Sequence, residues 1–390
     1  MANDYCTQVL DDPARIDRAA WNALVAADAD ANPFLRHEFL AALSDSGAAA
    51  APSGWHPHFL LLKRSGTLAA AAPLYVKDHS YGEYVFDWSW AEAYQRHGLA
   101  YYPKWLVAVP FTPVPGTRLL ARDDEARSEL AKALLAQARA SGLSSLHVLL
   151  APPRDIDALR RAGLLVRDGV QFHWRNAGYA GFDDFLAQLA QPKRKKIRAE
   201  RRKVGEAGVQ LERRVGGEIS EADWRFFFRC YLATYRAHFS PPYLNLDFFL
   251  RIAESMPEHL MLVLARRDGR PIASALGVFD AQHGAPRLYG RYWGAIEPVD
   301  CLHFECCYYQ MIEFAIERRL AWFEGGAQGA HKLARGLDPV PTQSAHWLAQ
   351  PAMMQAVSRF VERERAGVAE AIDELNEHRA FRPGACGAAG

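Results

Sequence analysis

The chain has 390 residues, of which 50% are hydrophobic and 23% charged. This composition is typical of globular domains with sizeable cores and excludes an intrinsically disordered chain. The 46 lysines and arginines nearly balance the 45 acidic residues, and a net charge of +1 excludes polyanion binding through bulk charge alone. The length favours two domains, or three small ones.

The sequence shows no pattern that is typical of a targeting signal. No apolar stretch approaches the roughly 18 residues that a transmembrane helix needs, so we expect none. The first residues, MANDYCTQVLDD, lack the basic and apolar regions of a signal peptide. The six cysteines show no disulfide spacing, so we expect a cytoplasmic protein with reduced thiols.

In the first half of the chain, the first clear helix signal is Asn32-Pro33, a capping residue followed by proline at the first helical position. Apolar runs on both sides of Ser65-Gly66 predict a hairpin. Residues 79–118 form an insert rich in aromatic residues and proline. The remaining elements are an amphipathic helix ending at Gly142, a strand SLHVLL, a small helix, and a strand pair around 164–175.

The second half repeats this order of elements. We predict, in turn, a basic helix at 192–206, a helix at 221–238, a hairpin of 259–266 with 271–279, a strand at 286–293, a helix at 303–319 and the strand AWFEGG. The tail from 351 to 379 predicts one long helix, or two broken near Gly367, with an apolar side that packs back on the first domain.

An internal duplication is indicated by two offsets. The hairpin turns at Gly66 and Gly269 differ by 269 − 66 = 203, and the helix-to-strand steps differ by 177. The insert at 79–118 accounts for the difference. The sequence therefore predicts two mixed α/β domains, at 1–170 and 171–350, and a C-terminal helix and tail at 351–390.

Four segments carry a family resemblance: VFDWSWAEAY at 85–94, RYWG at 291–294, LHFECCYYQ at 302–310 and FEGGAQGAHK at 323–332. They resemble a bacterial family of predicted N-acyltransferases of the peptidoglycan biosynthesis/recognition type, related to FemAB-like aminoacyl transferases. The resemblance implies two tandem GNAT-like folds plus a C-terminal helix. It also implies an acyltransferase that moves an activated acyl or aminoacyl group onto an amine of a small molecule or a muropeptide.

The basic helix is the strongest charge feature. From Lys193 to Lys203 there are eight basic residues and one acid, Glu200, a net charge of +7. Ile197 and Val204 provide an inward stripe, and the basic residues face outward. A solvated helix face is the alternative. We predict phosphate or tRNA contact, which the resemblance also implies, at Lys195, Lys196, Arg198 and Arg202.

A glycine-rich loop, GGAQGAHKLARG, follows the last predicted strand and is not a Walker loop. HKLARG resembles the Phe-Lys-x-x-Phe-Gly element of FemAB-like transferases, with Lys332 on its lysine and His331 and Arg335 in place of its aromatics. We expect Lys332 to stabilise the oxyanion of acyl transfer. A structural turn with an exposed lysine is the alternative. Gln328 and Arg335 are candidate substrate-binding residues.

Further candidates come from the neighbouring segments. Glu305, near a helix start, and His331 are candidates for proton handling, although capping or structural pairing is an equal alternative for Glu305. Candidate substrate-binding residues are Arg291, Tyr292 and Trp293 in RYWG, and Asp87 and Trp88 in the aromatic insert. His303 and Cys307 could share a metal, but two ligands do not make a site, so we predict no metal.

The donor stays open between aminoacyl-tRNA and acyl-CoA, and we expect no tightly bound cofactor. Acetyl-CoA enzymes of the GNAT type carry an Arg/Gln-x-x-Gly-x-Gly/Ala loop, and WGAIEPVDCLHFE at the matching position lacks it. This absence argues against a CoA donor. Two rival functions remain: an acetyl-CoA-dependent N-acetyltransferase, and a non-catalytic module that recognises a cell-wall precursor or nucleic acid.

Overall fold

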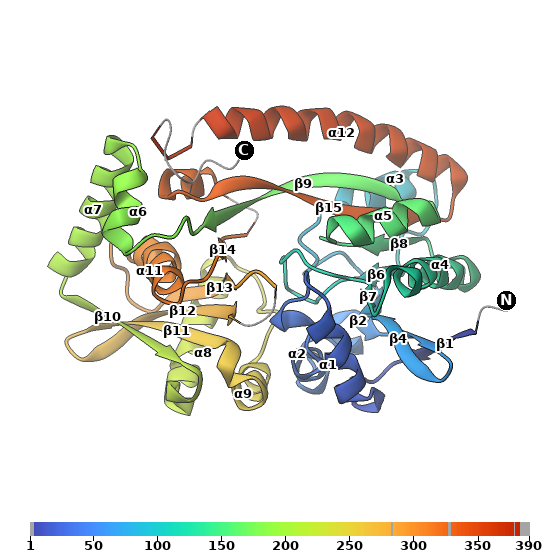
Figure 1. Ribbon diagram of the computed structural model, residues 1–390, viewed down its shortest axis with the longest axis horizontal. Coiled ribbons are helices and arrows are strands. Elements are labelled where there is room, and N and C mark those ends of the chain that lie inside the picture. Colours follow the sequence, from blue (N-terminus) through green and yellow to red (C-terminus); the bar gives the residue numbers. More distant parts are fainter. Residues whose placement is uncertain (1–3, 282–283, 327–328, 378, 383–390) are drawn as a thin grey trace. The chain divides into compact units, whose positions relative to one another are not determined.

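The computed structural model describes residues 4–281, 284–326, 329–377 and 379–382, and the chain divides into two compact units (Figure 1). The first unit comprises residues 1–170 and 341–371, and the second comprises 171–340 and 372–390. Two strands, β9 (Leu165–Arg175) and β15 (Asp338–Leu348), and the helix α12 (Pro351–Glu377) run from one unit into the other along the chain. In the described part of the chain, no helix combines the length and apolarity needed to cross a membrane.

The first unit builds its sheets from short strands packed against two helices. β3 pairs antiparallel with β1 and β4, while β6 pairs antiparallel with β5 and parallel with β8. The helices α4 and α5 cover an apolar core that includes Leu130, Leu134 and Leu159. Its elements are β1 (Tyr5–Leu10), α1 (Arg18–Ala27), α2 (His37–Asp45), β2 (Trp55–Pro57), β3 (Phe59–Arg64), β4 (Thr67–Ala72), β5 (Leu74–Lys77), α3 (Trp88–Arg96), β6 (Lys104–Val107), β7 (Leu120–Ala121), α4 (Asp124–Ser141), β8 (Ser145–Val148) and α5 (Pro153–Ala162).

The second unit holds one twisted sheet with strands in the order β10-β11-β12-β13-β14-β9. Neighbouring strands are antiparallel except β13 and β14, which are parallel and connected through α11. Its elements are α6 (Phe182–Gln188), α7 (Gln191–Glu206), β10 (Val209–Val215), α8 (Glu221–Ala237), α9 (Leu246–Ser255), β11 (Leu260–Arg267), β12 (Arg270–Asp280), β13 (Arg287–Ala295), α10 (Leu302–Phe304), a π-helical turn (Glu305–Tyr309), α11 (Gln310–Glu317), β14 (Trp322–Glu324) and a 3₁₀ helix (Ala330–Arg335).

Helices cover both faces of this sheet. Ile197 and Val204 of α7 and Met311 and Ile312 of α11 are buried in the same apolar core. On α8, the backbone approaches β13 so closely that a Cβ at Gly294 would lie 1.8 Å from the carbonyl oxygen of Cys230. Antiparallel strands followed by a parallel pair, covered by helices, form the mixed α/β unit that the sequence predicts.

Several local predictions were wrong. A helix begins already at Arg18. Asn32 and Pro33 do begin a helical turn, the 3₁₀ helix Pro33–Leu35, but the Asn32 side chain does not cap it, because its amide donates to the carbonyl oxygen of Pro115. The strand pair expected around 164–175 is one strand, β9. In the tail, by contrast, the first of the two predicted alternatives is confirmed: α12 is one long helix that continues through Gly367, since a helix tolerates a single glycine. Part of the expected insert is the sheet strand β6, so the extra residues lie between β5 and β6.

The start of α12 packs within the first unit. Met353, Val357 and Val361 are buried in a cluster with Trp90 and the tyrosines of the aromatic segment. These positions follow a spacing of four, which places them on one face of the helix. This face stabilises the aromatic segment by covering it.

Candidate functional site

The sheet of the second unit opens where β13 and β14 stop pairing. Their parallel register ends at Tyr289 and Glu324, and β13 continues to Ala295 without a partner on that side among the described strands. The register between β12 and β13 also slips at Leu276/Gly277, which bends β13 away. Glycines at 290 and 325 flank the opening, so no side chain fills it.

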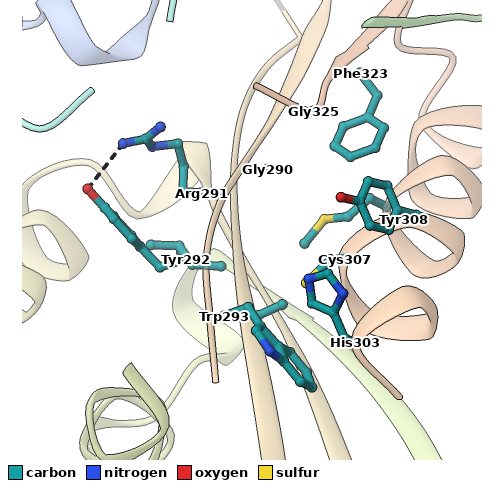
Figure 2. A pocket seen from close by; sticks show the side chains of 12 residues that line it. Gly290, Arg291, Tyr292, Trp293, His303, Cys307, Tyr308, Phe323 and Gly325 are labelled. Atoms are coloured by element: carbon teal, nitrogen blue, oxygen red, sulfur yellow. Dashed lines mark hydrogen bonds between the residues drawn. The ribbon is translucent and has the colours of Figure 1, made fainter. Parts of the chain in front are cut away.

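A pocket of about 140 Å³ occupies this opening (Figure 2). Phe323 and Gly325 line the pocket on the side of β14, and residues of the helix that follows β13 line its opposite side. Figure 2 shows the side chains of Arg291 and Tyr292 on one side of β13 and those of His303, Cys307 and Tyr308 on the opposite side. The complete lining is Ala275, Leu276, Gly290, Arg291, Tyr292, Trp293, His303, Cys307, Tyr308, Met311, Phe323 and Gly325.

The helical side of the pocket carries two imidazoles. His331 Nε2 lies 3.0 Å from the hydroxyl of Tyr308, and the ring of His303 packs against that of Trp293. Burial, with the cationic groups of His331, Arg335 and Lys332, lowers the pKa of His303 to about 4. Its imidazole is therefore neutral at pH 7, and this part of the pocket wall is uncharged.

Lys332 lies behind the glycine-rich loop. The side chain is 5% exposed, and its ammonium sits 5.8 Å from the centre of the Phe172 ring. Burial lowers the pKa of Lys332 to about 8. Within the described ranges no carboxylate pairs with Nζ, and a Cβ at Gly326 would meet no described group within 4 Å except Nζ, at 3.9 Å. Lys332 is not among the residues that line the pocket; its side chain lies behind Gly325, which does line it.

Arg335 holds the turn that carries His331 and Lys332. Its guanidinium donates to the hydroxyl of Tyr309 at 3.0 Å and to the carbonyl oxygen of His331 at 2.8 Å, and it makes a bidentate pair with Glu200. Both side chains of the Glu200–Arg335 pair are buried. Arg335 is therefore committed to protein acceptors and positions the turn, and the structure does not place it on the pocket wall.

Glu305 is also engaged away from the pocket. Its carboxylate pairs with Arg201 at 3.1 Å and accepts a hydrogen bond from Gln310. Arg201 pairs with Glu313 as well. These contacts tie α7 to the π-helical turn, and Glu305 is not among the lining residues.

The outward face of α7 carries the predicted phosphate contacts. Lys195, Lys196, Arg198 and Arg202 are exposed. Arg198 pairs with Asp183, and Arg202 lies 3.4 Å from Glu206. Lys195 and Lys196 have no acidic partner in the described part of the chain, so they are the cations most available to a polyanion.

The structure separates the remaining candidates from this pocket. Asp87 belongs to the first unit, where it pairs with Lys104 and accepts a hydrogen bond from Tyr101. Trp88, also in the first unit, is partly exposed and packs on Tyr81. Gln328 lies outside the described residues.

Sequence reasoning missed two buried groups next to Lys332. Glu324, the last residue of β14, lies directly opposite His173 of β9 in the antiparallel register. Both side chains are buried, and Gln171 lies on the same face of β9. The available signal was weak: an isolated histidine in a strand and a glutamate before two glycines match no motif.

The architecture and the opened strand pair define a tandem GNAT-like protein. Among solved structures, the chain resembles FemX (TM-score 0.56, 12% identity, covering 90% of this chain and 100% of that one). It is similarly related to the C-terminal domain of a putative lysylphosphatidylglycerol synthetase from Agrobacterium fabrum (0.55, 12%, 90% and 97%) and to L-PGS from Bacillus licheniformis (0.55, 10%, 88% and 97%). These likenesses show the fold.

The family is shown by the sequence itself. Residues 12–383 match the FemAB-like family, which is described by peptidoglycan biosynthesis/recognition. The chain belongs to this family. A comparison with curated proteins finds no match.

Proposed function

We propose that this protein is an acyltransferase that moves an activated acyl or aminoacyl group onto an amine of a peptidoglycan precursor. The observation that carries the proposal is the buried ammonium of Lys332, whose side chain lies behind Gly325 of the pocket wall. A preorganised cation in a site shielded from water stabilises the negative charge that develops on a carbonyl oxygen during acyl transfer. Family membership supports the choice of a peptidoglycan precursor as acceptor.

The pocket fits the acyl group of the donor. Its volume of about 140 Å³ suits a small group, and its walls are apolar or neutral on the helical side. The acceptor amine would attack the acyl carbonyl carbon and form a C–N bond. The C–O bond of the donor ester would then break, and the leaving oxygen would take up a proton as the amine nitrogen loses one.

The exposed cations of α7 favour aminoacyl-tRNA over acyl-CoA as donor. A tRNA backbone offers many phosphates to Lys195 and Lys196, and such contacts contribute additively to affinity. The missing pyrophosphate loop after β13 agrees with this choice. Because α7 is tied to the Lys332 turn through Glu200 and Arg335, a donor bound on α7 would lie on an element that holds the catalytic turn.

A transfer assay tests the proposal. Purified protein is incubated with a UDP-linked muropeptide and either a mixture of aminoacyl-tRNAs or acetyl-CoA, and the muropeptide is analysed by mass spectrometry. We expect the mass of one aminoacyl group to be added from the tRNA donors. Transfer from acetyl-CoA but not from aminoacyl-tRNA would show that the donor is an acyl-CoA. Binding of the muropeptide without any transfer would favour a non-catalytic recognition module.

A further inference from the structure

Tyr308 connects the pocket wall with the surface of the second unit. Its side chain is 5% exposed and belongs to the lining of the pocket (Figure 2). Its hydroxyl lies 3.0 Å from Nε2 of His331, and His331 is exposed. One hydrogen bond therefore links a group of the pocket wall with a group in contact with solvent.

Two short helical segments hold the phenol and the imidazole against each other. Tyr308 lies in the π-helical turn Glu305–Tyr309, a kind of turn that frequently marks a functional site. Its ring meets that of His331 edge-on, with ring centres 5.8 Å apart and planes at 83°. The backbone of His331 is fixed as well, because Arg335 donates to its carbonyl oxygen at 2.8 Å. The contact is thus preorganised from both sides.

Both groups carry the protonation state that a proton relay needs. Burial raises the pKa of Tyr308, so its hydroxyl keeps its proton at neutral pH. Two cations, Arg335 and Lys332, lie on the turn that carries His331, and burial together with these cations lowers the pKa of its imidazole. The neighbouring ring of His303, 6.5 Å away between ring centres, is uncharged at pH 7. A protonated phenol therefore stands beside a neutral imidazole that can accept its proton.

We propose that Tyr308 and His331 form a relay that carries the proton of the acceptor amine from the pocket to solvent. Resting on the proposed function, this inference adds the route by which the amine loses its proton. The acyl group occupies the pocket in that function, so the attacking amine comes within reach of the wall to which Tyr308 belongs. Tyr308 is the catalytic residue, and His331 acts through it.

The relay moves one proton at each of its two hydrogen bonds. As the C–N bond forms, an amine N–H bond breaks and its electron pair stays on nitrogen. The proton binds to the phenolic oxygen of Tyr308 while the phenolic proton moves to Nε2 of His331. The imidazolium then releases a proton to water, and the leaving oxygen of the donor takes one from water, so no net charge remains on the protein.

The other polar groups of the lining are less suited to this task. His303 has a pKa of about 4 and is too weak a base to hold the proton of an amine. Burial raises the pKa of the Cys307 thiol, which therefore stays protonated. Tyr292 accepts a hydrogen bond from Arg291, a cation that takes up no proton. Tyr308 differs from these groups because its partner is a neutral base at the surface.

The test uses the full-length protein and three variants, Tyr308→Phe, His331→Gln and the double variant, with His238→Gln as the control. Tyr308→Phe keeps the aromatic ring and deletes only the hydroxyl. His238 is an exposed histidine at the C-terminal end of α8 in the same unit. Single-turnover transfer rates are measured from pH 5 to 9 at saturating donor. We expect each single variant to lose about 10²-fold or more in rate, and the control to lose nothing.

The double variant and the pH profile distinguish a relay from two structural contributions. Because both groups act in one route, the double variant should be about as slow as the slower single variant. In the parent, the amine and His331 must both be uncharged, so the slope of log rate against pH should rise from about one to about two below the pKa of His331. Tyr308→Phe no longer reaches His331 and should keep a slope of about one. Histidine NMR titration of the substrate-free protein gives the pKa of His331 independently.

Each outcome decides the relay or the function on which it rests. If the parent transfers acyl groups and both single variants keep its rate, the relay is overturned and the transferase remains. Losses that multiply in the double variant, or a parent-like pH profile in Tyr308→Phe, would overturn it as well. Should Tyr308→Phe fail to fold, the rate and pH profile of His331→Gln, altered only at an exposed position, decide in its place. If the parent transfers no group from tRNA or CoA donors, the proposed function has failed, and the relay fails with it.

Discussion

Arg335 shows how one residue can organise this site without touching a ligand. Each of the three nitrogens of its guanidinium has a protein acceptor, on Tyr309, His331 and Glu200. Its plane also lies 3.5 Å from the centre of the Phe304 ring. The family element that HKLARG resembles has an aromatic residue at this position. The arginine can be buried here because Glu200 of α7 supplies a buried carboxylate that balances its charge.

Removing this arginine should destabilise the second unit. Arg335→Met leaves Glu200 buried without its counterion, and breaking such a pair costs about 3–5 kcal/mol of unfolding free energy. Urea denaturation measures it, and Arg198→Met, which breaks the exposed pair with Asp183, is the matched control with little expected effect. Adding Glu200→Leu to Arg335→Met should recover part of the loss. An Arg335→Met variant as stable in urea as the parent would contradict the stabilising role of the Glu200–Arg335 pair.

At the scale of elements, α7 combines an anchored face with a free one. Ile197 and Val204 are buried, Glu200 and Arg201 form ion pairs with the site, and Lys195 and Lys196 face outward. The helix therefore presents cations for a polyanion on one side while it holds the turn that carries Lys332 on the other.

The double variant Lys195→Glu/Lys196→Glu should weaken tRNA binding. It should also reduce the slope of log affinity against log salt concentration by the equivalent of about two phosphate contacts. The control Arg122→Glu/Arg161→Glu makes the same change in net charge at exposed positions of the first unit. Affinity is measured by filter binding from 50 to 300 mM salt. Equal slopes for the two double variants would show that net charge, and not this helix face, determines binding.

Long periodic elements were predictable, and the chemistry between them was not. The hairpin at Gly269, the basic helix and the strand before the glycine-rich loop follow from apolar periodicity and turn residues, which act locally. The Glu324–His173 pair depends on which strands become neighbours, and β9 and β14 are far apart in the sequence. For the same reason the chain pattern could not show that Glu305 faces Arg201.

At the scale of the whole molecule, each unit contains a parallel strand pair, and among the described residues the two pairs end differently. β6 and β8 in the first unit correspond to β13 and β14, but there the amide of Leu149 donates to the carbonyl oxygen of Val107 beyond the last paired residues. The buried Arg118 then donates to the carbonyl oxygen of Leu149. These protein groups extend the pairing of β6 with β8 beyond its last register pair, and this difference supports placing the proposed acyl transfer in the second unit.

The terminal helix should matter for global stability. Truncation after Gln350 removes Met353, Val357 and Val361 from their cluster, and burial of each such side chain contributes about 1.5–3 kcal/mol. We expect a loss of several kcal/mol in the free energy of unfolding, measured by urea denaturation. Truncation after Arg382 is the control. A protein shortened at Gln350 that unfolds at the same urea concentration as this control would contradict the packing role of α12.

The most direct test of the account is the single-turnover rate of Lys332→Met, measured with donor affinity and compared with Lys332→Arg. Loss of the cation should lower the rate by about 10²–10³-fold while affinity is retained. Since burial places the pKa of Lys332 at about 8, the parent should lose activity as pH rises through that value, whereas Lys332→Arg should stay active above it. A parent-like rate in Lys332→Met at pH 7, where the parent lysine is charged, would contradict the central claim.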